Sequence, residues 1–170
     1  AFILLGVSSG SRVGLIGGML YILAHSVAKA GLFLCCGIVE HNVHTKDLTR
    51  IGGLARTMPR TAAAFLLCAL SVMGIPPFSG FFAKYLVIDG AVEAGQPLLA
   101  AVFLLGAVLT VLYLLRLFKI VFLGKPTFPD THEGSPEMVW VAVGLAAVSL
   151  ALGLVIAWPS GLAALIGGIA

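Results

Sequence analysis

Long uninterrupted apolar runs are the feature that most limits the folds open to this chain. Four of them cover residues 13–39, 61–88, 97–123 and 138–158, each near or above the ~20 residues that a helix needs to cross a bilayer. In hydrocarbon every backbone N–H and C=O group must be paired internally, so only helices and closed barrels span a membrane. Barrel strands would alternate apolar and polar residues over about ten positions. Since these runs are continuous and longer, the sequence predicts an all-α bundle of transmembrane helices, about four in this chain.

The residue composition is typical of a membrane protein. Hydrophobic residues make up 60% of the chain and charged residues only 10%, against about 45–50% and about 25% in soluble domains. The basic residues form no stripe or patch of the kind that binds nucleic acid. Cys35, Cys36 and Cys68 lie within apolar runs and lack metal-ligand spacing. We therefore expect no metal, no disulfide and no cofactor in this chain.

The two ends of the chain carry short apolar segments. Residues 1–7 lack the basic start of a signal peptide and cannot span a bilayer alone. We expect them to be the tail of a preceding helix, and residues 1–170 to be the C-terminal part of one longer transmembrane domain. Residues 162–170 are expected to extend the last helix or to lie at the membrane interface.

The segments between the runs alternate in charge. Residues 89–96 contain Asp89 and Glu93 and no basic residue. Residues 41–60 instead carry four Lys and Arg residues, and residues 125–137 begin at Lys125, shortly after Arg116 and Lys119. Because basic residues near helix ends favour the cytoplasmic side, we expect residues 41–60 and 125–137 to be cytoplasmic. We also expect a short surface helix around residues 45–51.

Lys29 lies near the middle of the first run, roughly 24 Å along a helix that rises 1.5 Å per residue. A lysine at the centre of a membrane costs at least ~2.5–3.5 kcal/mol to insert, and such residues usually line ion or proton pathways. His25 and Tyr21 precede it at intervals of four residues and share its helix face. Because histidine titrates near neutral pH, this column is a candidate proton path. The alternative is a hydrogen-bonded histidine and a lysine paired with a carboxylate, which the apolar runs do not supply.

The second run contains a helix-breaking segment, residues 74–80, which reads GIPPFSG. Each proline lacks an N–H donor and clashes with the carbonyl four residues earlier, which frees the carbonyls of Val72 and Met73. Broken helices at membrane depth line cavities or lie buried in protein, and they point to ion sites in transporters. Lys84 follows in the first turns of the second half, so we expect it to exchange protons; a lysine that reaches the far interface is the alternative. The residues expected to make the break are Gly74, Pro76, Pro77 and Gly80.

Other polar residues near helix ends are candidates for an auxiliary role. Ser79 is expected to cap the second half of the broken helix. Arg116 and Lys119 lie near the predicted cytoplasmic end of the third run, where side chains that reach the interface explain them adequately. Glu40 and His41 end the first run at the interface, and either could serve as a proton entry group.

Two of these segments carry a family resemblance. Residues 25–33 read HSVAKAGLF and residues 74–84 read GIPPFSGFFAK. They resemble the H-x-x-x-K-x-x-L-F helix and the G-x-P-P-x-x-G-F-x-x-K broken helix of antiporter-like, proton-translocating membrane subunits. Residues 49–54 and 112–125 are similar to a loop and a helix of the same family. The resemblance covers roughly residues 13–125.

The family includes the large membrane subunits of respiratory complex I (NADH-quinone oxidoreductase), the Mrp-type cation/proton antiporters and the membrane-bound hydrogenases. The resemblance implies a larger fold of two inverted repeats with polar residues along the membrane midplane. It also implies that Lys29 corresponds to the central lysine, His25 to its neighbour, and Lys84 to the lysine of the second broken helix. The implied partners are other membrane subunits in a cell inner membrane, with the redox cofactors in those partner subunits.

We therefore expect a subunit that translocates protons in a redox-driven, complex I-related assembly and catalyses no reaction itself. The first alternative is a Mrp-type subunit that exchanges Na⁺ for H⁺; the lack of a carboxylate deep in the runs slightly favours protons. From another class, a structural membrane anchor would leave Lys29 and the broken helix unexplained. A membrane enzyme would need a nucleophile–base or metal-ligand constellation, which the sequence does not show.

Overall fold

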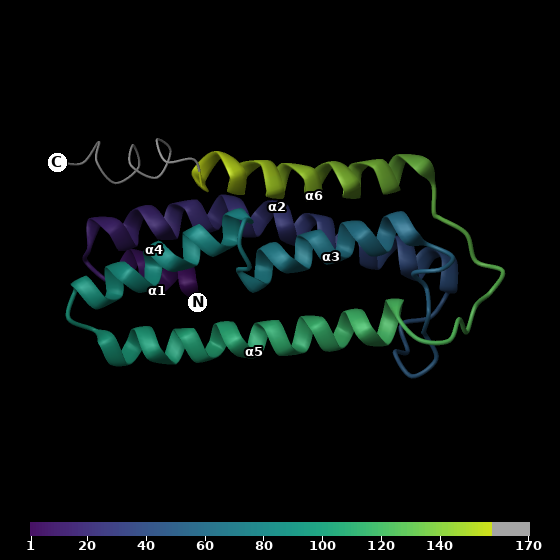
Figure 1. Cartoon of the computed structure of the whole chain (residues 1–170), viewed down its shortest axis with the longest axis horizontal. Helices are drawn as coiled ribbons and strands as arrows, with labels where there is room; N and C mark the ends of the chain where they lie inside the picture. Colours follow the sequence, from purple (N-terminus) through teal and green to yellow (C-terminus); the bar gives the residue numbers. More distant parts are fainter. Residues whose placement is uncertain (158–170) are drawn as a thin grey trace.

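The computed structural model describes residues 1–157, and this part of the chain is all-helical, as predicted. The helices run along one another, with α6 on one side of the molecule, α5 on the other, and α2, α3 and α4 between them (Figure 1). Residues 158–170, which include the predicted end of the fourth run and the last apolar stretch, lie outside the described residues. The helices are α1 (Phe2–Ser8), α2 (Arg12–Val43), α3 (Pro59–Met73), α4 (Ser79–Glu93), α5 (Pro97–Phe122) and α6 (Pro136–Ala157).

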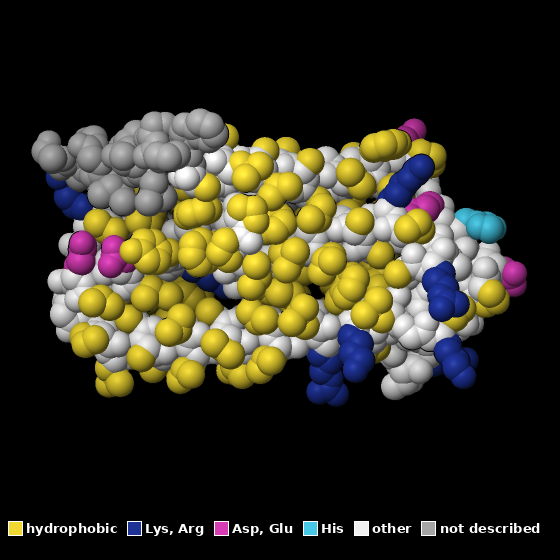
Figure 2. All heavy atoms as spheres, viewed as in Figure 1, with side chains coloured by type: hydrophobic (Ala, Val, Ile, Leu, Met, Phe, Trp, Pro, Cys, Tyr) yellow, Lys and Arg dark blue, Asp and Glu magenta, His cyan; other side chains and the backbone are white. Residues whose placement is uncertain are grey.

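Three described helices, α2, α5 and α6, are long and apolar enough to cross a membrane. The predicted second span is divided into α3 and α4, which have 15 residues each and are too short to cross a bilayer singly. The chain is thus a multi-pass membrane protein. Hydrophobic side chains cover its flanks, while most charged side chains gather toward the two ends (Figure 2).

Proline and glycine set the helix boundaries. Pro59, Pro97 and Pro136 are the first residues of their helices, where a missing N–H donor costs nothing. Gly74 ends α3 in the left-handed conformation with φ 82°, and its N–H donates to the carbonyls of Leu70 and Ser71. The chain therefore leaves the helix after Met73, where the break was predicted, and becomes helical again at Ser79.

Glycines allow α2 and α4 to pack backbone against backbone. A Cβ atom on Gly90 of α4 would collide with the backbone of Gly14, and one on Gly17 would collide with the backbone of Val87. Small residues allow the same close approach between helices in membranes generally. This packing fixes the second half of the broken helix against the helix that carries His25 and Lys29.

The two loops that flank α3 and α5 meet at one end of the bundle (Figure 1). Backbone N–H groups of Gly53, Leu54 and Ala55 donate to carbonyls at the end of α5, over distances of 3.0, 3.3 and 2.9 Å. The prediction of a short helix around residues 45–51 is wrong. There the Asp47 carboxylate accepts from the Thr49 hydroxyl and backbone N–H, at 2.7 and 2.9 Å, which stabilises a turn instead of a helix.

Candidate proton-transfer site

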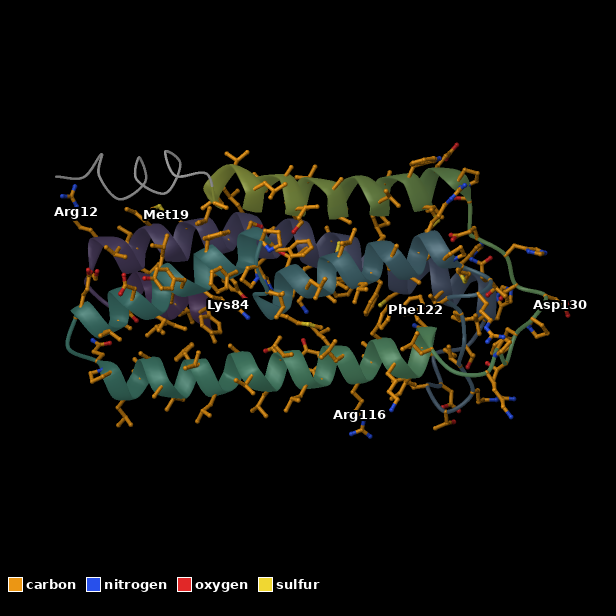
Figure 3. The ribbon with its side chains drawn as sticks, viewed as in Figure 1. Arg12, Met19, Lys84, Arg116, Phe122 and Asp130 are labelled. Carbon is orange, nitrogen blue, oxygen red and sulfur yellow. The ribbon has the colours of Figure 1, made fainter. Side chains whose placement is uncertain are left out.

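Lys84 closes the break between α3 and α4. Its side chain is 5% exposed, and its Nζ donates to the carbonyl oxygens of Val72 at 2.8 Å and Met73 at 3.0 Å. These are the two carbonyls that Pro76 and Pro77 leave without helical donors. The lysine thus reaches back from α4 to the end of α3 and supplies the missing hydrogen bonds (Figure 3). It lies at the break and does not reach toward an interface.

Aromatic rings connect Lys84 to the polar face of α2. The Nζ of Lys84 lies 5.1 Å from the ring centroid of Phe2, within cation–π range. The Phe2 ring in turn lies 5.6 Å from that of Tyr21, and Tyr21 lies 5.2 Å from His25. Tyr21 is buried. The predicted column on α2 therefore begins beside the break.

His25, on α2, is half-buried and lies near both Lys29 and Lys84. It interacts electrostatically with both Lys29 and Lys84. Its Nδ1 is buried and has no hydrogen-bond partner within residues 1–157. A buried polar atom normally has a partner, so this nitrogen is free to take a proton or a water molecule.

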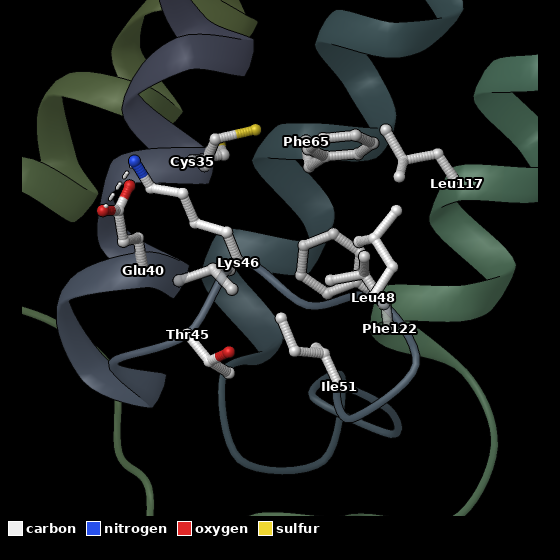
Figure 4. A pocket seen from close by; sticks show the side chains of 12 residues that line it. Cys35, Glu40, Thr45, Lys46, Leu48, Ile51, Phe65, Leu117 and Phe122 are labelled. Carbon is white, nitrogen blue, oxygen red and sulfur yellow. Dashed lines mark ion pairs between the residues drawn. The ribbon is translucent and has the colours of Figure 1, made fainter.

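Lys29 lines an open cavity of about 190 Å³ between α2, α3 and α5. A second cavity, of about 230 Å³, shares Cys36, Phe65 and Leu117 with the first and continues toward the end of α2. At its far end lies the ion pair between Lys46 and Glu40, with 3.1 Å between Nζ and Oε1 (Figure 4). The two cavities together lead from Lys29 to the loop end of the bundle through mainly apolar walls.

The remaining predicted residues do not join this group. Arg116 and Lys119 are exposed on α5, and Arg116 points away from the bundle (Figure 3). His41 is exposed and lies beside His44, with 6.3 Å between the ring centroids. The cap expected at Ser79 is wrong: Phe78 holds the N-cap position without a side-chain hydrogen bond, since the extended chain after the prolines ends there.

Several contacts of the site were not anticipated from sequence. Ser71, Ser79 and Ser149 have buried hydroxyls without partners among the described residues. Glu133 accepts from the backbone N–H of Arg60 at 2.6 Å and from the Thr61 hydroxyl at 2.9 Å, and so caps α3. The sequence predicts Ser79 only as a helix cap, Ser71 and Ser149 show no signal beyond their place in apolar runs, and Glu133 is 73 residues from Arg60. Within residues 1–157 no three His, Cys, Asp or Glu side chains could hold a metal ion together.

The sequence profile of the transmembrane proteins of the NADH:quinone oxidoreductase/Mrp antiporter family matches residues 1–110. The chain belongs to this family. Among its relatives, "NADH-quinone oxidoreductase subunit N" of Desulforudis audaxviator is 35% identical over 135 residues, which is 79% of this chain and 27% of the relative. A Na⁺/H⁺ antiporter subunit of Alkalihalophilus pseudofirmus is 32% identical over 154 residues, or 89% of this chain and 31% of the relative.

A solved structure of the Mrp complex from Dietzia sp. DQ12-45-1b contains a chain with the same fold. The TM-score is 0.82 and the identity 34%, over 90% of this chain and 37% of that one. The family resemblance seen in the sequence is thereby confirmed. This chain spans only part of the proteins it matches: it covers 27% and 31% of the two relatives and 37% of the solved chain.

Proposed function

We propose that this chain is the C-terminal part of an antiporter-like subunit that moves protons across a cell inner membrane. The observation that carries the proposal is the geometry of Lys84, a buried ammonium held by two main-chain carbonyls at a helix break. Broken helices in transporters place such backbone groups at the ion site. The family membership supports the same role.

The proposed relay has three steps. A proton enters from the loop end of the bundle beside Glu40 or His41, and the adjoining cavities lead it to Lys29. It passes along the face of α2 through His25, whose unpartnered Nδ1 accepts it. Lys84 then exchanges it with the opposite side. Because like charges repel strongly in low dielectric, protonation of one group favours loss of the proton from the next.

We propose that the end of the bundle where the loops before α3 and after α5 meet faces the cytoplasm. Residues 41–60 and 125–137 lie at the same end of the bundle, as the distribution of Lys and Arg requires if both are on one side (Figure 1). Residues 89–96, which carry Asp89 and Glu93, lie at the other end.

The partners proposed for the full-length protein are other membrane subunits of a multi-subunit complex. Its relatives are named as subunits, and the solved structure is described as a complex. In a complex I-related assembly, redox cofactors in partner subunits would supply the driving force. The second candidate is a Mrp-type Na⁺/H⁺ antiporter subunit, which the relative from Alkalihalophilus pseudofirmus favours.

The test is Lys29→Met in the full-length protein within its native complex, reconstituted in liposomes. Proton uptake, followed with a pH-sensitive dye, should fall by about tenfold or more, equivalent to about 1.4 kcal/mol in the barrier. Lys125→Met, at an exposed loop lysine, is the control and should pump normally. Undiminished uptake by the Lys29→Met variant would contradict the proposal.

A further inference from the structure

We propose that the outer face of α5, at the loop end of the bundle, binds an anionic phospholipid whose phosphate lies between Arg116 and Lys119. The lipid belongs to the leaflet at the loop end, and its acyl chains run along α5 toward the middle of the membrane. This face takes no part in the proposed proton relay, so lipid binding there does not depend on the proposed function.

Two basic side chains on this face lack an acidic partner. Arg116 and Lys119 are exposed, and no carboxylate within residues 1–157 forms an ion pair with either of them. They lie three residues apart and therefore project from the same side of the helix, with about 5–6 Å between their Cβ atoms. Arg116 points away from the bundle (Figure 3). A guanidinium binds two phosphate oxygens at once and an ammonium adds a second charge beside it, so the pair suits one phosphodiester anion.

The same face is apolar beyond the two basic residues. Leucines recur on it at intervals of seven, four and three residues, and each is more than half exposed: Leu98, Leu105, Leu109 and Leu112. This spacing places them in one stripe that ends at Arg116. Hydrophobic side chains cover this flank of α5, and Lys and Arg side chains lie at its loop end (Figure 2). A basic end joined to an apolar stripe matches the anionic head and the acyl chains of a phospholipid.

The depth of the basic residues agrees with a headgroup. The helix α5 has 26 residues and is therefore about 39 Å long, which exceeds the ~30 Å hydrocarbon core. Arg116 lies six residues before Phe122, the last residue of the helix, or about 9 Å from its end. From there a long basic side chain reaches the phosphates. The stretch from Leu105 to Arg116 covers about 16 Å, close to half of the hydrocarbon core, which is the depth of a single leaflet.

The two unpaired positive charges select an acidic headgroup. Phosphatidylcholine carries its own cation, which compensates the charge of its phosphate. Phosphatidylglycerol has no such cation, so its phosphate gains more from Arg116 and Lys119. Each Lys or Arg near a membrane surface strengthens binding to anionic lipids by about fivefold. The site therefore prefers phosphatidylglycerol to phosphatidylcholine.

The test uses a phosphatidylglycerol analogue with a photoactivatable diazirine near the headgroup and a phosphatidylcholine analogue with the same diazirine. The complex that contains the full-length protein is reconstituted in phosphatidylcholine vesicles with a trace of either probe and illuminated, and the labelled peptides are identified by mass spectrometry. The phosphatidylglycerol probe should label residues 112–123 at least about fivefold more than the phosphatidylcholine probe. Raising the salt from about 0.1 M to about 1 M should weaken this preference, because it shortens the Debye length from about 10 Å to about 3 Å.

Arg116→Gln and Lys119→Gln should each lower labelling by the phosphatidylglycerol probe by about fivefold, and the double variant should lower it further. Arg50→Gln is the matched control, because it removes one positive charge from an exposed loop residue at the same end of the bundle; labelling of α5 should be unchanged. Equal labelling of the unsubstituted protein by the two probes overturns the proposal, as does labelling that neither the double variant nor salt changes. Labelling of another subunit in place of α5 also overturns it, because that subunit then covers the face.

Discussion

Lys84 donates to the carbonyl of Val72 across the helix break, at 2.8 Å, and takes the place of the N–H that Pro76 cannot offer. Its second bond, to Met73, does the same for Pro77. One side chain therefore satisfies the backbone of α3 and carries the ammonium for which we propose the proton-exchange role. The structural and proposed functional roles of Lys84 are consequently inseparable, and substitutions at this position should change stability as well as transport.

Lys84→Met should lower the free energy of unfolding by about 1–3 kcal/mol for each buried carbonyl left without a donor. Thermal unfolding of the purified full-length protein would measure the change. Lys125→Met, which removes an exposed lysine, should stay within about 0.5 kcal/mol of the unsubstituted protein. Equal stability of the two variants would show that the carbonyls of the break find other donors.

Gly90, which packs against α2, and Gly106, which faces open space on α5, should respond differently to an added side chain. Gly90→Leu should destabilise the protein by at least about 1–3 kcal/mol, since even a Cβ at this position meets the backbone of Gly14. Gly106→Ala, on α5 with no atom within 4 Å of the added Cβ, should be neutral or stabilise by up to about 1 kcal/mol because alanine favours the helix. The yield and unfolding temperature of both variants in detergent test the pair.

The cap that Glu133 forms on α3 should stabilise the protein at the loop end of the bundle. Its carboxylate accepts from the backbone N–H of Arg60 and the hydroxyl of Thr61 at the start of α3. Glu133→Ala should cost about 0.5–2 kcal/mol, the usual range for a lost helix cap. Asp130→Ala, at an exposed residue of the same loop, should cost little. If both variants unfold at the same temperature, the cap does not contribute to stability.

The loop turn at Asp47 should depend on pH. The Thr49 hydroxyl and backbone N–H donate to the Asp47 carboxylate and hold its pKa below the usual value. A lowered pKa means that the stabilisation is fully present above about pH 4 and is lost as the pH falls through the lowered pKa. Hydrogen exchange at the Thr49 amide should show protection at pH 6 that declines as the pH falls below about 4. Asp47→Asn should abolish this dependence on pH; retention of it would assign the effect to another group.

The break was predictable because it follows from covalent chemistry. Pro76 and Pro77 cannot donate, so the sequence alone identified the carbonyls of Val72 and Met73 as unpaired. What the sequence could not supply is the donor. Lys84 finds these carbonyls because α4 starts again at Ser79 and packs on α2 in one particular orientation, which depends on tertiary contacts.

Contacts between distant segments account for most of what sequence reasoning missed. Periodicity placed His25 and Lys29 on one helix face, yet the cavity beside Lys29 arises from α3 and α5, which are remote in the chain. The Glu133 cap joins the loop after α5 to the start of α3 for the same reason. At Asp47, a local side-chain hydrogen bond replaces the short helix expected there, because it offers the backbone a competing partner.

The backbone hydrogen bonds from Gly53, Leu54 and Ala55 to the end of α5 restrict how the helices can move relative to one another. The break joins α3 to α4, and residues 94–96 join α4 to α5. With these hydrogen bonds from the segment before α3 to the end of α5, the three rigid helices form a closed loop. Three rigid helices closed in this way cannot change one angle while the other two joints stay as they are. If Lys84 releases Val72 and Met73 and the break opens, the link between α4 and α5 or the hydrogen bonds at the end of α5 must give way with it.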